Sequence, residues 1–167
     1  KIRWSKLEVW LLLLGLLGVL ILGMSGALTA LGDTLFPVNS IEEGIQQDFS
    51  STAHFLVRLR ILHPTLAILV AAYLIIVVNW INSRNKRRLN RKIGWVLISL
   101  FVLQLLGGLV NVLLLAPVWM QMVHLLLSDS VWICLVLYAA EAMTREEITH
   151  EEDQGSDLSE QAELGKL

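Results

Sequence analysis

Long apolar runs, separated by a few short polar segments, dominate this sequence. Four of these runs are long enough to form a helix of about 20 residues, which is what crossing the hydrocarbon core of a bilayer requires. Because lipid offers no hydrogen bonds to an exposed backbone, we predict that each run is a transmembrane α-helix. The predicted spans cover about residues 9–30, 61–81, 93–115 and 118–143.

Most connections between these spans are short, which favours antiparallel packing of consecutive helices. The predicted fold is therefore an all-α membrane protein, a four-helix antiparallel transmembrane bundle formed by residues 1–143. The one sizeable loop, residues 32–59, contains Ser40 followed three residues later by Glu43, a spacing typical of a helix-capping box. We expect a short surface helix there, with Ile41, Ile45 and Phe49 on one side.

Basic residues concentrate in one loop. The segment SRNKRRLNRK, between the second and third predicted spans, contains no acidic residue. The positive-inside rule predicts that this loop is cytoplasmic, and the alternation of spans then places both termini on the same side. This topology signal explains the basic loop without a nucleic-acid partner. Residues 144–167 form an acidic tail with few apolar residues, which we expect to be disordered.

Composition excludes several classes of protein. Of 167 residues, 55% are hydrophobic and 17% are charged, and the mean hydropathy is +0.64. An ordinary soluble domain does not have this balance. The single cysteine, Cys134, excludes a disulfide scaffold and a cysteine-rich metal module. Because the chain begins with Lys1, we expect that it starts inside a longer protein or follows processing.

Two of the four histidines fall within or at the edge of predicted spans, where ionisable side chains usually face the bundle interior. His63 lies at the outer end of the second span. His124 lies about two helical turns inward from the outer end of the fourth span, at a similar depth. Two imidazoles that face each other across a bundle can ligate one haem iron. The alternative is that both histidines hydrogen-bond to neighbouring helices.

Nearby residues bear on this haem hypothesis. Arg60 precedes His63 by three residues and shares its helix face, and Arg58 lies closer still to the outer water. Guanidinium groups bind carboxylates in bidentate fashion, so both arginines are candidate partners of haem propionates. Their alternative role is to reach the lipid headgroups. Gly107 and Gly108 on the third span would admit either a flat macrocycle or a closely packed helix.

Asp129 is a further acidic residue within the spans. It lies five residues beyond His124 and is rotated about 140° from it around the helix. We therefore do not expect it to contact that imidazole directly. Protonation, hydrogen bonding to a serine beside it or to another helix, and a proton-relay role all remain open.

Four motifs in order resemble the haem A synthase family: SGALTALGDTLFP after the first span, the histidine opening the second, LQLLGGLVNV on the third and MVHLLLSDSVW on the fourth. The resemblance covers about residues 7–141. It implies that the chain is similar to the C-terminal half of an eight-helix, pseudo-symmetric protein. Family members convert haem O to haem A for cytochrome oxidase. One half handles the substrate haem, and the other holds haem b between two histidines, which His63 and His124 match.

Two departures from the family pattern lie next to His63. The substrate half of family members typically has a glutamate three residues before its first histidine, and this chain has Arg60 there. The resemblance therefore implies the haem b half, without a catalytic residue. The common His-Arg dipeptide is replaced by His63 and Pro64, which leaves open whether Arg58 and Arg60 bind the propionates. The loop cysteine pair of some members is also missing.

The resemblance implies a haem A synthase-like oxidoreductase of the bacterial inner membrane. It also implies that a companion half binds haem O, and that haem O synthase or other oxidase assembly factors are partners. Ligation by two imidazoles leaves no open iron position, so this haem would transfer electrons or support the structure. The alternatives are a stand-alone bis-histidine membrane cytochrome b for electron transfer, a compact synthase made of identical four-helix chains, and a haem-free transporter or assembly subunit.

Overall fold

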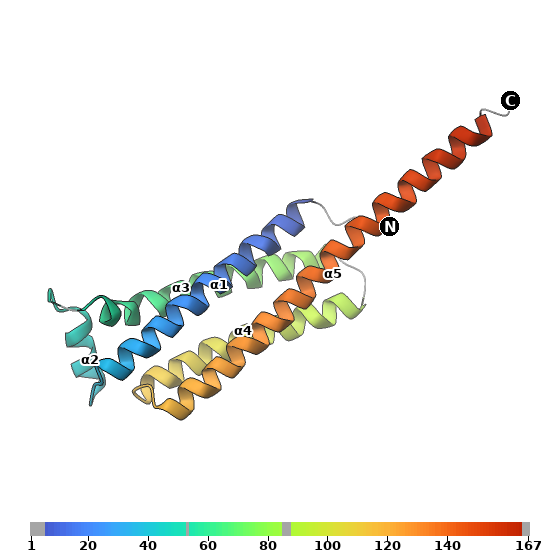
Figure 1. The fold of residues 1–167 in the computed structure, drawn as a ribbon. Coiled ribbons are helices and arrows are strands. Elements are labelled where there is room, and N and C mark those ends of the chain that lie inside the picture. The colour runs from blue at the N-terminus through green and yellow to red at the C-terminus, as the bar shows by residue number, and fades with distance from the viewer. Residues whose placement is uncertain (1–5, 53, 85–87, 165–167) are drawn as a thin grey trace.

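A computed structural model of the protein describes residues 6–52, 54–84 and 88–164, and of residues 142–164 it describes the backbone alone. Within these ranges all regular structure is helical. The helices are α1 (Lys6–Leu35), α2 (Ile41–Asp48), α3 (Phe55–Arg84), α4 (Arg88–Leu113) and α5 (Val118–Leu164). Figure 1 shows that α1, α3, α4 and α5 run in alternating directions along one bundle. The predicted all-α antiparallel fold is confirmed.

The four long helices all contain a segment long and apolar enough to cross a membrane. These segments are Leu7–Leu35, Phe55–Arg84, Leu89–Leu113 and Val118–Glu141. Many large apolar side chains lie exposed on the outside of the bundle, as expected where helices face lipid instead of water. The protein is therefore a membrane protein with four candidate spans. The helix α3 begins earlier than the predicted second span and contains Pro64 in its interior.

The helices form a closed ring of neighbours. Helix α1 packs against α3 and α5, and α4 packs against the same two helices. Helices α3 and α5 therefore occupy diagonally opposite corners of the bundle. We call the end that carries α2 the α2 end, and the opposite end, where the chain begins, the basic-loop end.

The tightly packed core lies toward the basic-loop end. Its most completely buried side chains come from all four long helices: Leu12, Leu74, Val78, Ile81, Leu97 and Leu135. A buried polar group lies beyond this core, where the Tyr138 hydroxyl donates a hydrogen bond to Asn82 Oδ1 at 3.1 Å. The side chain of Asn82 lies directly against Gly94, where any larger residue would collide with it. This end of the bundle is consequently held by close interhelical contacts.

At the α2 end, the short helix predicted from Ser40 and Glu43 is present as α2. Ser40 is its N-cap, and Ser40 Oγ accepts a hydrogen bond from the Glu43 N–H at 3.1 Å. The Glu43 carboxylate accepts one from the Asn39 N–H at 2.9 Å. These two bonds satisfy backbone donors that a helix start leaves unpaired. Helix α2 packs against α3.

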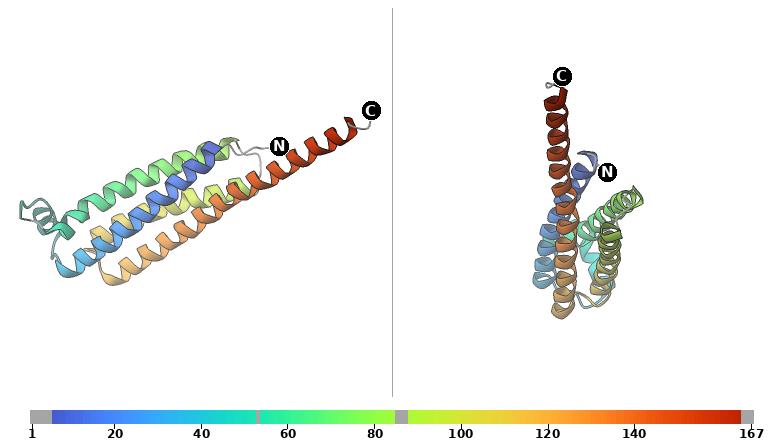
Figure 2. Two further views of the ribbon diagram at one scale, coloured as in Figure 1. Left: turned by 45° about the horizontal axis from the view of Figure 1, so that its top comes forward. Right: turned by 90° about the vertical axis from the view of Figure 1, so that its right-hand side faces the viewer.

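Helix α5 differs from expectation at its C-terminal end. It continues to Leu164, so residues 144–164 are helical where the sequence analysis expected a disordered tail. Figures 1 and 2 show this part of α5 projecting beyond the other helices. Its sequence is rich in Glu, a residue that favours helix even where it cannot build a core, and it has no proline. The end of the predicted tail, residues 165–167, lies outside the described residues.

Candidate functional site

His63 and His124 each contact a neighbouring helix of the bundle, His63 contacting α1 and His124 contacting α4. They lie on α3 and α5, the diagonal pair of helices, and both side chains are half-buried. Neither ring is completely enclosed by protein side chains, so both stay accessible to a group bound between them.

The surroundings of His63 fix which of its ring nitrogens carries the proton. Its Nδ1 lies 2.9 Å from Ser25 Oγ on α1. The hydroxyl proton of Ser25 is already donated to the Leu22 carbonyl at 2.8 Å. Because a hydroxyl has one proton, His63 Nδ1–H must be the donor to Ser25. This tautomer leaves a lone pair on Nε2, the form in which a histidine binds a metal.

His124 lies against α4 and has an incomplete set of hydrogen bonds. Gln104 Nε2 lies 3.3 Å from His124 Nε2, and an amide nitrogen can only donate. The proton of His124 then resides on Nδ1, which is buried and has no partner among the described residues. The carbonyl oxygen of Gln104 is buried without a partner as well. Unsatisfied buried polar atoms are rare in native proteins, and they often mark a site where a further group binds.

Both imidazoles rest on backbone that lacks side chains. A Cβ at Gly26 of α1 would lie 2.9 Å from Cε1 of His63, and a Cβ at Gly108 of α4 would lie 3.1 Å from Cε1 of His124. At Gly107 it would approach His124 Nδ1 to 3.6 Å. The glycines therefore allow the two rings to sit close to the neighbouring helices.

The level of the bundle that contains the histidines is loosely packed compared with the core. No residue of α3 between Leu59 and Ala71 is buried, and none of α5 between Met120 and Val131. Glycines, half-buried histidines and unpaired polar atoms thus occur together at one depth. These residues fit a flat group ligated from both sides, such as a haem.

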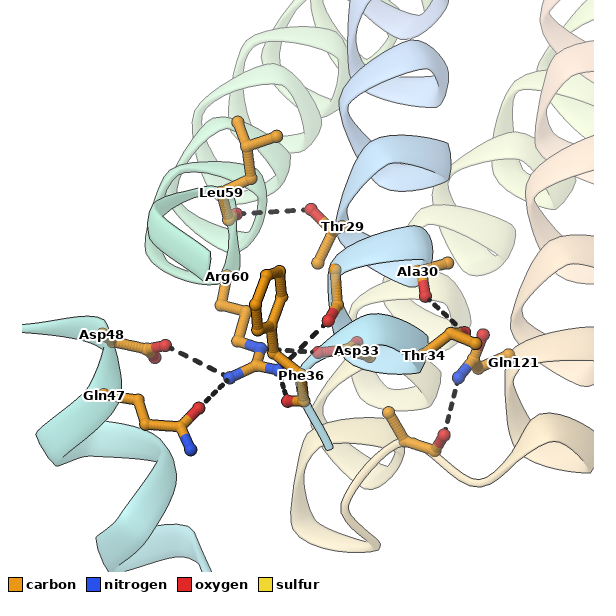
Figure 3. A network of polar contacts seen from close by, with 12 residues as sticks. Thr29, Ala30, Asp33, Thr34, Phe36, Gln47, Asp48, Leu59, Arg60 and Gln121 are labelled. Carbon is orange, nitrogen blue, oxygen red and sulfur yellow. Dashed lines mark hydrogen bonds and ion pairs between the residues drawn. The ribbon is translucent and has the colours of Figure 1, made fainter. Parts of the chain in front are cut away.

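Arg60 contacts residues at the end of α1 and in α2 (Figure 3). Its Nε donates to Asp33 Oδ1 at 2.7 Å, and Nη1 lies 3.4 Å from Gln47 Oε1 and 3.6 Å from Asp48 Oδ1. Its Nη2 donates to the carbonyl oxygen of Phe36. Arg60 therefore joins α3 to the end of α1 and to α2, and a propionate contact would have to compete with these partners.

Asp48 and Arg58 are two further charged residues at the α2 end of the bundle. Burial raises the pKa of Asp48, although the charge of Arg60 and its hydrogen bond act in the opposite direction. Arg58 is exposed, and its Nη2 lies 3.4 Å from the Ser51 carbonyl oxygen. It is separated from His63 by five residues, or about 140° around α3. The structure therefore does not place Arg58 on the face of the helix that carries His63.

Sequence reasoning missed three residues that contact the histidines: Ser25, Gly26 and Gln104. Ser25 and Gly26 were named only within the motif SGALTALGDTLFP, and Gln104 only within the motif LQLLGGLVNV. Gln104 precedes Gly107 by three residues and Gly108 by four, so these three residues share one face of α4. That spacing was the available signal for a polar residue beside the glycine surface.

Known proteins with similar sequences include one protein family and two curated relatives. A family model described as cytochrome oxidase assembly protein matches residues 3–136. Two curated relatives from two strains of Thermus thermophilus, both named Protoheme IX farnesyltransferase, are 48% and 47% identical to the chain over 134 residues. The match covers 80% of this chain and 22% of each relative, so the chain spans about a fifth of their length. No solved structure matches.

Proposed function

The chain belongs to the cytochrome oxidase assembly protein family, and on that premise we propose that it is the haem-b-binding unit of a haem A synthase-like oxidoreductase. His63 and His124 are the residues that would hold this haem. The observation that carries this proposal is their placement on diagonal helices, each against a glycine surface, at the loosely packed level of the bundle.

The residues around the histidines have separable roles in this proposal. Ser25 accepts the hydrogen bond of His63 Nδ1–H, which would leave the Nε2 lone pair available to a haem iron. Gln104 lies beside His124, and its amide would have to release His124 Nε2 before that nitrogen could bind iron. Gly26, Gly107 and Gly108 give the rings room. A haem with two imidazole ligands supplies one-electron transfer, because no iron position is left for oxygen.

At the level of the whole protein, the proposed activity is the conversion of haem O to haem A for cytochrome oxidase. A companion four-helix unit would bind haem O, since this chain has Arg60 where the substrate half typically has glutamate. The name of the two Thermus relatives supports a haem-related substrate, and we propose haem O synthase or another assembly factor as a partner. The basic loop supports a bacterial inner-membrane topology with cytoplasmic termini.

The second candidate function is a stand-alone bis-histidine cytochrome b. The observation that favours it is the engagement of Arg60 with Asp33, Gln47 and Asp48, which makes this position a structural contact instead of a catalytic one. Pigment extraction after incubation with haem O separates the two. Conversion in the presence of a companion unit, lost on removing this chain, supports the synthase, whereas electron transfer without any conversion supports the cytochrome.

The ligand assignment is tested by haem content. The full chain is purified with haem supplied during expression, alongside His63→Ala and His124→Ala. His54→Ala is the matched control, because His54 is an exposed histidine near the same end of the bundle. We expect both ligand variants to lose most of their bound haem and the control to retain it. An unchanged Soret band in both ligand variants would refute the assignment.

A further inference from the structure

Each long helix carries a polar residue one turn closer to the α2 end than the histidine site. The reference positions in the site are Gly26 on α1, His63 on α3, Gly108 on α4 and His124 on α5. A separation of three residues keeps a side chain on the same helix face as its reference position. The residues found there are Thr29, Arg60, Asn111 and Gln121, which we call the polar set. Figure 3 shows Thr29, Arg60 and Gln121 at this end of the bundle.

The two sides of the histidine site differ in polarity. Toward the basic-loop end lies the core, whose most completely buried side chains, such as Leu74 and Leu97, are all apolar. Toward the α2 end lies the polar set. A haem carries two propionate groups on one edge, and an ionised carboxylate is very costly to bury among apolar side chains. A haem held by His63 and His124 would therefore turn its propionates toward the polar set.

Three members of the polar set already have partners. The Thr29 hydroxyl donates to the Ser25 carbonyl oxygen at 2.9 Å and lies 3.3 Å from that of Leu59. The guanidinium of Arg60 is bound by groups of α1 and α2, as described above. Gln121 Nε2 donates to the Ala116 carbonyl oxygen at 2.6 Å.

Asn111 is the member of the polar set whose side chain lacks a partner in the part of the chain that the structure describes. Its Oδ1 is buried and accepts no hydrogen bond, and its amide nitrogen donates none. Asn111 lies two residues before the end of α4 at Leu113, yet burial closes this oxygen off from headgroup water. A half-turn of the amide exchanges its oxygen and nitrogen, so the same position can present an N–H donor. Buried polar atoms without partners often mark a place where a further group binds.

The backbone next to Asn111 is held in an unusual conformation. Leu115 and Ala116 have φ angles of 60° and 52°, in the left-handed region that residues other than glycine rarely adopt. The Ala116 N–H donates to the Asn111 carbonyl oxygen at 2.8 Å, and the Ala116 carbonyl oxygen accepts from Gln121. These two bonds fix the turn that joins α4 to α5. Strained backbone of this kind clusters at ligand-binding sites, and here it fixes the end of α4 that carries Asn111.

We propose that Asn111 binds a haem propionate, with its side-chain amide as the hydrogen-bond donor. This inference rests on the proposed haem site and adds the residue that selects for a free carboxyl group at its α2 end. It also replaces the two arginines suggested by the sequence, because Arg60 is bound to other groups and Arg58 lies on a different helix face. Gln104, the other amide with a buried unpaired oxygen, has its nitrogen against His124 instead.

The experiment compares two ligands on the same protein. The full chain is purified without haem and titrated with haem b and with haem b dimethyl ester, in which both propionates are esterified and carry no charge. The quantity measured by the Soret band is the ratio of the two affinities. In Asn111→Leu we expect this preference for the free acid to fall by about tenfold, because a hydrogen bond to a charged group is lost. Any general damage to the fold weakens both ligands and cancels in the ratio.

Two further variants sharpen the test. Thr29→Val is the matched control, because its hydroxyl is already bonded to backbone carbonyl oxygens, and we expect the parent ratio. Asn111→Asp places a carboxylate against the propionate, so haem b should bind more weakly than to Asn111→Leu while the ester does not. A parent chain that binds haem b, with the same ratio in Asn111→Leu, would overturn this inference alone. A parent chain that binds neither ligand would overturn the proposed function and this inference with it.

Discussion

A methyl group added at Gly26 tests the close fit between α1 and the ring of His63. In Gly26→Ala the new Cβ would lie 2.9 Å from His63 Cε1 and 3.4 Å from Nε2. Carbon atoms in contact are normally at least about 3.5 Å apart, so the ring must move by roughly 0.6 Å. Such a movement is large compared with the tolerance of a metal ligand, which is about 0.2 Å in bond length.

The expected cost falls on the haem-bound state. Overpacking of this kind costs about 1–3 kcal/mol, which corresponds to a loss of haem affinity of roughly 5- to 150-fold at 1.4 kcal/mol per tenfold change. In the haem-free chain the ring can move away only by weakening its hydrogen bond to Ser25, so the thermal unfolding temperature should fall slightly as well. The assay is haem titration of the purified chain, followed by the Soret band.

Gly18→Ala is the matched control for this prediction. Gly18 lies on the same helix and also faces α3, but its Cβ would lie 3.5 Å from Val70, an ordinary contact. We expect the control to retain the haem affinity of the parent chain. If Gly26→Ala and Gly18→Ala bind haem equally well, the ring of His63 is not held against α1 in the haem-bound protein, and the reasoning is refuted.

Three further predictions concern the residues around the site. Ser25→Ala removes the acceptor for His63 Nδ1–H, so haem affinity measured by titration should fall by about tenfold or more, whereas Thr65→Ala, on an exposed face of α3, should leave it unchanged. Arg60→Leu leaves Asp33 without its cation, so the free energy of unfolding should fall by about 3 kcal/mol in thermal or denaturant unfolding. Arg58→Ala should change it by less than about 0.5 kcal/mol, and equal effects of the two would contradict the ion-pair network. Burial raises the pKa of Asp48 above its ordinary value of 3.8, so the folded state binds this proton more tightly than the unfolded chain and stability should fall as the pH rises through the window just above 3.8. Asp48→Asn should remove this slope from pH-dependent unfolding, and an unchanged slope would show that another group is responsible.

The spans were predictable because a membrane imposes a length and a composition that are visible in the sequence. The start of α3 was placed too late because Arg58 and Arg60 interrupt the apolar run. The ion pair between Arg60 and Asp33 joins residues that are 27 positions apart, and the sequence does not show that their helices bring them together. Helix α3 therefore reaches Phe55 even though its first turns contain charged residues.

The depth of His63 and His124 was visible in the sequence, but their contacts were not. In a soluble helix the polar face reveals which side is buried, whereas here the lipid-facing and core-facing sides are equally apolar. The rotation of each helix is therefore not visible in the sequence. For that reason Ser25 and Gln104 could not be assigned to His63 and His124 in advance. The sequence likewise showed only that Asp129 and His124 lie on different sides of their helix. It did not show that Asp129 faces outward.

Electron paramagnetic resonance of the oxidised, haem-loaded chain tests the central claim most directly. Two imidazole ligands give low-spin ferric haem, and loss of either ligand leaves a five-coordinate, high-spin iron. We predict a low-spin signal for the parent chain and for His54→Ala, and a high-spin signal for any haem that His63→Ala and His124→Ala retain. A parent-like low-spin signal in both ligand variants would contradict the account.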